Sequence, residues 1–166
     1  MNNQEKYIQL AVYHSCGLPI SDFKQEVEST EYQACRFKVS GSKVISRKAK
    51  ITPKKVGQFV TFWKRNGNGP IEPFEEKEDF DFFVVNVKNE TRSGQFVFPK
   101  AILLKKGILS TETKEGKRAF RVYPVWDAAK SKQAVQTQKW QLDYFFEINT
   151  SLNMNKVKEL YSKSAF

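Results

Sequence analysis

The chain has 166 residues, of which 40% are hydrophobic and 14% aromatic, and its net charge is +10 at pH 7. This length and composition predict a single globular domain over residues 1–166, with a core large enough to fold alone. No apolar run approaches the roughly 20 residues of a membrane helix, and the first residues lack the basic start of a secretory signal. We therefore expect a cytoplasmic protein that does not enter a membrane.

Few residues are suited to catalysis or redox chemistry. His14 is the sole histidine, which excludes His-based catalytic triads and multi-His metal sites. Cys16 and Cys35 lack the spacing of metal ligands, so we expect reduced thiols. The chain has neither a Walker loop nor a dinucleotide-binding glycine motif. We therefore expect no resident metal or cofactor, and the sequence leaves the oligomeric state open.

The first fifty residues predict a helix followed by a hairpin. Apolar residues at 7, 8, 11 and 12 recur at helical spacing, in a helix that ends near Gly17. Residues 32–39 and 43–51 are typical of strands, and the Ser-Gly-Ser stretch between them suits a hairpin turn.

A Thr-Pro pair then suits the N-cap and the first position of a helix over residues 53–65. Apolar residues follow at i, i+3, i+4 and i+7, which predicts a stripe that carries Phe59 and Trp63 into the core. Phe62 lies off that stripe, which makes it the candidate for stacking on a nucleotide base.

The second half of the chain alternates strands and helices. An acidic run at 72–81 is a polar connection into a continuous apolar strand at 82–88, which we place near the sheet centre. The remaining predicted elements are strands at 95–98 and 118–123 and helices at 100–106, 132–148 and 155–162. Together these elements predict a mixed α/β domain with one central sheet flanked by helices.

Positive charge is concentrated between residues 32 and 71, a stretch that we call the basic segment. It contains no Asp or Glu, whereas the other 126 residues hold 18 basic and 18 acidic residues. Its ten cations are Arg36, Lys38, Lys43, Arg47, Lys48, Lys50, Lys54, Lys55, Lys64 and Arg65. An acid-free run of this length predicts a surface that binds a polyanion, most simply DNA or RNA, single-stranded or double-stranded.

We expect phosphate contacts with little sequence readout. Lys54 and Lys55 fall in the first turn of the predicted helix, where the helix dipole adds positive partial charge and a bound anion would remove the repulsion. The residues predicted to bind nucleic acid are Arg36, Lys38, Arg47, Lys48, Lys50, Lys54, Lys55, Lys64 and Arg65, with Arg118 and Arg121 as support from a later strand.

Four long stretches of the sequence resemble the MepB-like family of small bacterial proteins. They are TPKKVGQFVTFWKR, SGQFVFPKAILLKKGILS, GKRAFRVYPVWD and SKQAVQTQKWQLDYF. The resemblance spans about residues 31–148. It implies a restriction-endonuclease-like α/β core, a mixed sheet with helices on both faces. The family has no settled biochemical role, so the resemblance implies no activity.

Two alternatives to plain nucleic-acid binding stay open. The first is a Mg²⁺- or Mn²⁺-dependent nuclease, with Glu31, Asp79, Asp81 and Lys100 as catalytic candidates. The endonuclease pattern has an Asp on one strand and Asp/Glu-x-Lys on the next, but residues 95–97 are Gln-Phe-Val. The resemblance therefore implies a degenerate site that binds without cutting. The second alternative is an interaction protein, whose basic face meets an acidic partner or the 72–81 run of a neighbouring copy.

Overall fold

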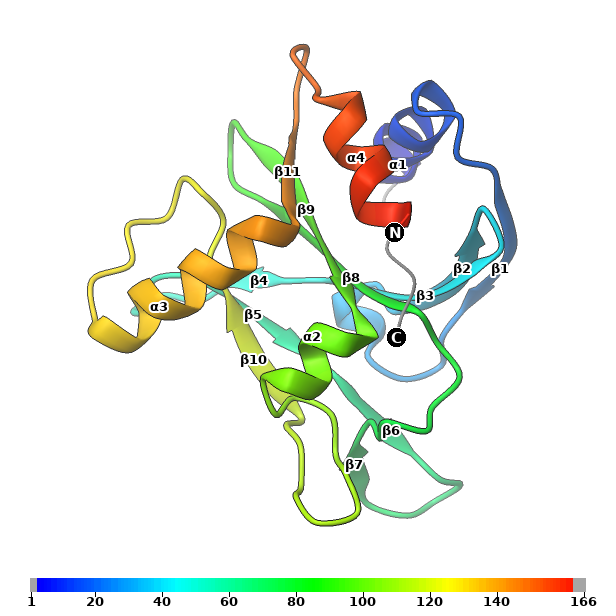
Figure 1. The fold of residues 1–166 in the computed structure, drawn as a ribbon, viewed down its shortest axis with the longest axis vertical. Helices are drawn as coiled ribbons and strands as arrows, with labels where there is room; N and C mark the ends of the chain where they lie inside the picture. Colours follow the sequence, from blue (N-terminus) through cyan, green and yellow to red (C-terminus); the bar gives the residue numbers. More distant parts are fainter. Residues whose placement is uncertain (1–2, 163–166) are drawn as a thin grey trace.

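The structure of the chain, a computed structural model, describes residues 3–162. A six-stranded sheet, which we call the main sheet, runs through the molecule (Figure 1). In spatial order its strands are β1 (Ile20–Gln25), β2 (Cys35–Val39), β3 (Ser42–Lys48), β8 (Phe82–Lys88), β9 (Ser93–Pro99) and β11 (Phe145–Ile148). β3 and β8 are parallel, and the other neighbouring strands are antiparallel.

The centre of the main sheet is the apolar strand that the sequence predicts at residues 82–88. Phe82 and Phe83 point to opposite faces and are both 0% exposed, because β8 has a neighbour on each side and cover on each face. The predicted hairpin is also confirmed. β2 and β3 pair antiparallel, and Ser40 and Gly41 between them both have positive φ, as a tight hairpin turn needs.

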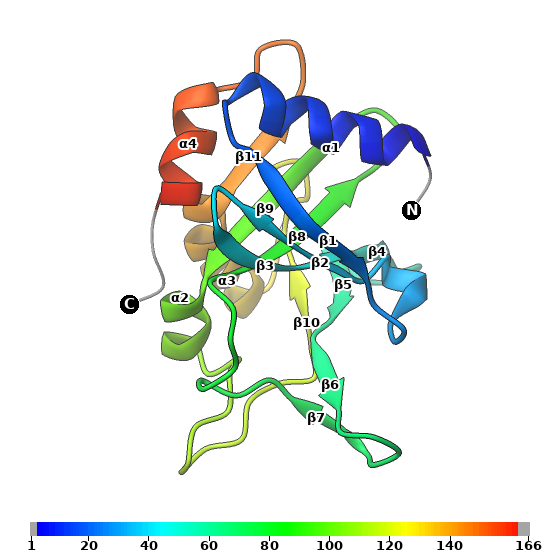
Figure 2. The ribbon, with the colours of Figure 1, turned by 90° about the vertical axis from the view of Figure 1, so that its right-hand side faces the viewer.

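Two helices, α1 (Asn3–Ser15) and α4 (Met154–Ser162), cover one face of the main sheet. Figure 2 shows them near each other at one end of the molecule. Tyr13 of α1 and Tyr161 of α4 are buried together, and their hydroxyl oxygens are hydrogen-bonded at 2.8 Å. Both helices were predicted from the sequence, and both are confirmed.

The opposite face is covered by a smaller sheet and two helices. The smaller sheet has the order β10 (Ala119–Val122), β5 (Gln58–Thr61) and β4 (Lys50–Ile51), and the chain continues from β5 into the hairpin of β6 (Trp63–Arg65) and β7 (Ile71–Pro73). The helices are α2 (Lys100–Lys105) and α3 (Lys132–Gln141). Two single-turn 3-10 helices, η1 (Thr30–Tyr32) and η2 (Leu142–Tyr144), complete these elements. The mixed sheet with helices on both faces is therefore confirmed.

The predicted helix over residues 53–65 is wrong, because this stretch forms a turn followed by β5 and β6. Burial alternates strictly from residue 58 to residue 63, which is the period of a strand. Gly57 has a φ of +83°, and a Cβ at this position would lie 2.6 Å from the Tyr123 ring. The aromatic and β-branched residues that follow are good strand formers, so pairing with β10 outweighs the helical spacing.

Phe62 is consequently a core residue, and its predicted role as an exposed stacking platform is wrong. Its side chain is 0% exposed, and its ring stacks on Phe83 with 4.1 Å between centroids. The alternation of a strand also changes which of the other aromatic side chains of this stretch are buried. Phe59 and Trp63, predicted to lie in the core, are only half-buried.

The predicted helix over residues 132–148 is correct only in its first ten residues. α3 ends at Gln141, and the chain then passes through η2 into β11, which pairs with β9. Gly94 of β9 permits this pairing, since a Cβ there would lie 2.5 Å from the Phe145 ring. The contact joins residues far apart in the sequence, so no local pattern announces it.

Cys16 and Cys35 are buried free thiols, in agreement with the sequence prediction. Burial raises the pKa of Cys35 to about 11, which disfavours the reactive thiolate. Across residues 3–162, no helix has both the length and the apolar character needed to span a bilayer.

Candidate nucleic-acid interface

Carboxylates flank the basic segment on both sides in sequence, and they meet its cations in the fold. Ten acidic residues lie at 22–31 and 72–81, as many as the cations between them. Six of those cations pair with these carboxylates: Arg36–Glu26, Lys38–Asp22, Lys43–Asp79, Lys50–Glu31, Lys64–Glu78 and Arg65–Glu28. The basic segment is therefore largely neutralised. Acidic residues of the 72–81 run thus form ion pairs with cations of the same chain. The interaction-protein alternative expected this run to pair with a neighbouring copy.

Arg47 lies inside the protein. It is 4% exposed, and burial lowers its pKa to about 10. Its Nη1 donates to the Ser46 carbonyl at 3.5 Å, and its Nε has no partner among the described residues. A side chain in this position does not reach a ligand on the surface, so the prediction that Arg47 contacts phosphate is wrong.

Lys54 and Lys55 are exposed in the turn between β4 and β5. No helix begins there, so the predicted contribution of a helix dipole is wrong. Arg121 ties this turn to β10, because its guanidinium donates to the Thr52 hydroxyl at 2.7 Å and to the Gly57 carbonyl at 3.3 Å. Arg121 is thus a positioning residue for the turn that carries Lys54 and Lys55.

The charge that is left without carboxylate partners lies further along the chain. Residues 100–141 hold ten basic residues and three acidic ones. Their net charge is therefore +7, compared with +10 for the whole chain. Of the acids, Glu115 pairs with Arg118 at 2.7 Å, and burial raises the pKa of Asp127. Arg118, a predicted contact, is therefore partly neutralised, whereas the lysines around it dominate this part of the chain.

A cleft of about 390 Å³, which we call the basic cleft, opens between β10, α3 and residues 106–108, which follow α2. Its lining includes Lys106 and Lys117, and none of the thirteen described residues that line it is an Asp or Glu. Sequence reasoning missed Lys106. The low acid content of residues 100–141 indicates this cluster, but the stretch is not free of acidic residues and so differs from the basic segment.

Aromatic and uncharged polar side chains complete the lining of the basic cleft. They are Tyr123, Ser131, Gln133, Thr137 and Trp140. Tyr123 and Trp140 are half-buried, so part of each ring is accessible. The Lys106 ammonium lies 5.4 Å from the centroid of the Trp140 ring, which is a cation–π contact.

Two glutamines, one of them fully buried, fix the α3 wall of the basic cleft. Gln141 is 0% exposed. It donates from Nε2 to the Arg121 carbonyl and accepts at Oε1 from the Tyr123 N–H, both at 2.9 Å. Gln138 Nε2 donates to the Asp127 carbonyl at 2.9 Å. The side-chain amides of both glutamines are hydrogen-bonded to backbone groups of β10 and of the chain after it. These bonds hold α3 and β10 together as one rigid frame.

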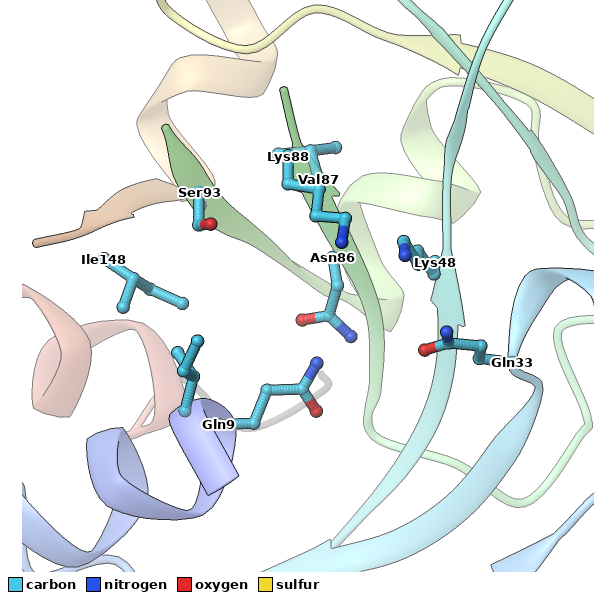
Figure 3. Close-up of a pocket in the computed structure, with 10 residues that line it drawn as sticks. Gln9, Gln33, Lys48, Asn86, Val87, Lys88, Ser93 and Ile148 are labelled. Atoms are coloured by element: carbon cyan, nitrogen blue, oxygen red, sulfur yellow. The ribbon is translucent and has the colours of Figure 1, made fainter. Parts of the chain in front are cut away.

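A second, smaller pocket of about 40 Å³ lies at the carboxyl ends of β3 and β8 and contains Lys48 (Figure 3). Its polar groups are used within the protein. Asn86 accepts from Gln95 at 2.8 Å and donates to the Ser46 hydroxyl at 3.3 Å, while Lys48 and Lys88 each have interaction partners. Lys48 therefore belongs to this pocket and not to an extended basic surface.

The carboxylates proposed for the nuclease alternative do not converge on one site. Lys43 binds two of them, since its ammonium pairs with Asp79 and its backbone N–H donates to Asp81 at 2.8 Å. This pairing lowers the pKa of Asp79. Glu31 lies beyond the far end of β3, where it pairs with Lys50 at 3.7 Å. Among the side chains that the structure describes, no three His, Cys, Asp or Glu residues form a group that could hold a metal ion.

The Lys100 ammonium, the fourth catalytic candidate, donates to the backbone carbonyl of Glu78 and lies 5.1 Å from the centroid of the Phe80 ring. These contacts fasten the 72–81 run to the start of α2. Lys100 is thus near Asp81 in the fold, but its ammonium is engaged with backbone and an aromatic ring.

The chain is similar to one protein family and to several solved structures. A sequence profile of the MepB-like family matches residues 26–147. The crystal structure of MepB is similar, with 40% sequence identity and a TM-score of 0.76, over 80% of this chain and 89% of that chain. A bacterial homing endonuclease is similar at 16% identity and a TM-score of 0.47, over 82% of this chain and 85% of that chain. No curated protein matches significantly.

Proposed function

This chain belongs to the MepB-like family, and we propose that it binds nucleic acid through the basic cleft. The observation that carries this proposal is the lining, which contains Lys106 and Lys117 and, among the described residues, no Asp or Glu. A concave surface with cations and no carboxylate attracts anions. A polymer with a charge on every repeat gains the most from such a surface.

The dimensions of the basic cleft suit a polymer with regularly spaced phosphates. β10 spans about 10 Å from Ala119 to Val122, and Lys117 and Tyr123 line the cleft beyond its two ends. Lys54 and Lys55 adjoin the far end, because Arg121 binds their turn and Gly57 packs on the Tyr123 ring. Each strand of a helical nucleic acid carries one phosphate per about 3.4 Å of helix axis, so the basic cleft together with Lys54 and Lys55 would meet more than one phosphate.

Contacts of this kind give affinity without sequence readout, because lysine ammoniums on phosphates carry no base information. We expect binding to DNA or RNA in the cytoplasm. Titration of fluorescently labelled oligonucleotides, followed by anisotropy at several salt concentrations, tests the proposal. The logarithm of the association constant should fall linearly with the logarithm of salt concentration, by about 0.7 to 0.9 per phosphate contacted.

The decisive variant is the double substitution Lys106→Ala and Lys117→Ala, which should flatten that salt slope by about two. Its matched control is Lys38→Ala with Lys77→Ala, which removes the same net charge from lysines that pair with Asp22 and Glu75. If the control flattens the slope as much as the cleft variant, the binding follows net charge alone and the basic cleft is not the site.

The nuclease alternative is less well supported, because Glu31 lies apart from Asp79 and Asp81 and both aspartates are engaged by Lys43. Incubation with plasmid DNA and Mg²⁺, with and without EDTA, tests it directly. We expect no metal-dependent cleavage. Cleavage that is lost in Asp81→Ala would replace the binding proposal with the enzymatic one.

A further inference from the structure

The basic cleft contains more than the cations that phosphates require. Along α3, the residues that reach the cleft are Gln133, Ala134, Thr137, Trp140 and Gln141, which lie on one face of a helix because they recur at i, i+1, i+4, i+7 and i+8. Gln141 is used by β10, but Gln133 and Thr137 carry uncharged donors and acceptors. Phosphate binding by lysines alone does not require these uncharged donors and acceptors on α3.

Two aromatic rings in the lining are suited to a nucleotide base. Trp140 packs against Phe98 at 5.6 Å and Tyr144 at 6.5 Å between centroids, so its indole is held by the core while part of it reaches the cleft. The Tyr123 ring lies against Gly57, and Gln141 holds the backbone N–H of Tyr123. Rings that are fixed before binding stack on a base with little loss of conformational entropy.

The size of the basic cleft restricts what enters it. At about 390 Å³, it falls within the range of about 300–1,000 Å³ that is typical of small-ligand pockets. A base paired inside a duplex is stacked on both sides and does not enter a pocket of this kind unless it is extruded. An unpaired base has both faces and its hydrogen-bonding edge available.

We propose that the basic cleft receives an unpaired base of single-stranded nucleic acid, with the base against Trp140 or Tyr123 and the adjacent phosphates on Lys106 and Lys117. This inference rests on the proposed nucleic-acid binding and names its ligand class. Gln133 and Thr137 face the edge of the base. Because a threonine hydroxyl can hydrogen-bond several bases and every base has a stacking face, the preference among sequences is weak.

The test compares three oligonucleotides of equal length on the wild-type protein: a single-stranded thymidine oligomer, its duplex, and an abasic oligomer that keeps every sugar and phosphate. Single-stranded thymidine should bind at least about tenfold more tightly than the abasic oligomer, which is the effect of stacking one base. Equal affinity for the thymidine and abasic oligomers would overturn this inference and leave phosphate binding intact. Failure of all three to bind would overturn the proposed function itself.

Trp140→Leu supplies the second arm. It should lower the affinity for the thymidine oligomer by about tenfold or more and leave the affinity for the abasic oligomer unchanged. Trp63→Leu is the matched control, because Trp63 is a half-buried tryptophan on β6, outside the basic cleft. Gln133→Ala changes an exposed residue and gives an independent readout if Trp140→Leu is poorly folded. An effect of Trp140→Leu that is equal on both oligomers would contradict base insertion.

Discussion

The basic segment and residues 100–141 each carry ten cations, but the fold treats them in opposite ways. The basic segment has no acid of its own and is neutralised by carboxylates that flank it in sequence. Residues 100–141 contain three acids and keep most of their charge, around a concave site. The comparison shows that an acid-free window in a sequence does not predict a charged surface. The surface charge depends on which strands and loops the fold places so that acidic side chains lie beside basic side chains.

Exposed ion pairs such as Lys38–Asp22 contribute little stability individually. Their effect is on the electric field, because a cation with a carboxylate at about 3 Å attracts a distant anion far less than an isolated cation does. The cations of the basic segment therefore take part mainly in contacts within the fold. Residues 100–141 keep most of their positive charge, which is available for a ligand.

The largest expected effect concerns the structural role of the neutralised segment. Phe62→Ala should lower the free energy of unfolding by about 3–5 kcal/mol, because the ring is fully buried against Phe83 and its loss leaves a cavity. Denaturation in urea measures this. Trp63→Ala, at a half-buried neighbouring position, should cost clearly less. The reverse order would restore the helical interpretation of this stretch.

The next effect concerns the wall of the basic cleft. Gln141→Ala leaves the Arg121 carbonyl and the Tyr123 N–H without their partner, which should destabilise the protein by about 2–4 kcal/mol. Gln136→Ala, at an exposed position of the same helix, should change stability by less than about 0.5 kcal/mol. Equal stability of the two variants in thermal denaturation would mean that Gln141 does not hold the frame.

A smaller effect is expected where the two regions meet. Lys54→Ala with Lys55→Ala removes the two exposed lysines of the basic segment that adjoin the basic cleft. The salt slope of oligonucleotide binding should flatten by about one to two, with the folded structure unchanged by circular dichroism. No change in slope would confine the interface to β10, α3 and residues 106–108.

The smallest effect is expected for the buried cation. Arg47→Met should change nucleic-acid affinity by no more than about twofold, because the side chain is 4% exposed. Replacing a buried charge with an apolar side chain of similar volume is often neutral or stabilising, so the urea midpoint should not fall. A large loss of affinity in a variant of normal stability would show that Arg47 reaches the ligand after all.

Local signals in the sequence predicted much of the fold. The continuous apolar run of β8, the turn at Ser40 and Gly41, and the helical spacing of α1 each depend on neighbouring residues. The errors occurred where distant pairing decides. Phe62 has neighbours spaced as in a helix but lies between the strands β5 and β6, where its N–H donates to the Arg118 carbonyl. Phe145 and Phe146 continue a helical pattern but pair with β9. In both places a glycine on the chain or its partner strand, Gly57 or Gly94, permits the close approach.

The candidate site was harder to predict, because it depends on what remains after the ion pairs form. Arg65 meets Glu28 and Lys64 meets Glu78, contacts that require the strand order of the fold. Lys106, just after α2, and Trp140 of α3 come together, and neither stands in a recognisable motif. Lys54 and Lys55 were predicted as contacts at the start of a helix, whereas their exposure comes from a turn, and their part in binding stays a prediction.

The hydroxyl groups of Tyr13 and Tyr161 meet although 148 positions separate the residues. A growing polypeptide leaves the ribosome from its N-terminus, so the first helix emerges long before the last one that completes its surroundings. Part of the apolar face of the main sheet therefore stays accessible to chaperones until α4 has emerged. A chain shortened by the final helix would keep that apolar surface open and be a target for proteolysis.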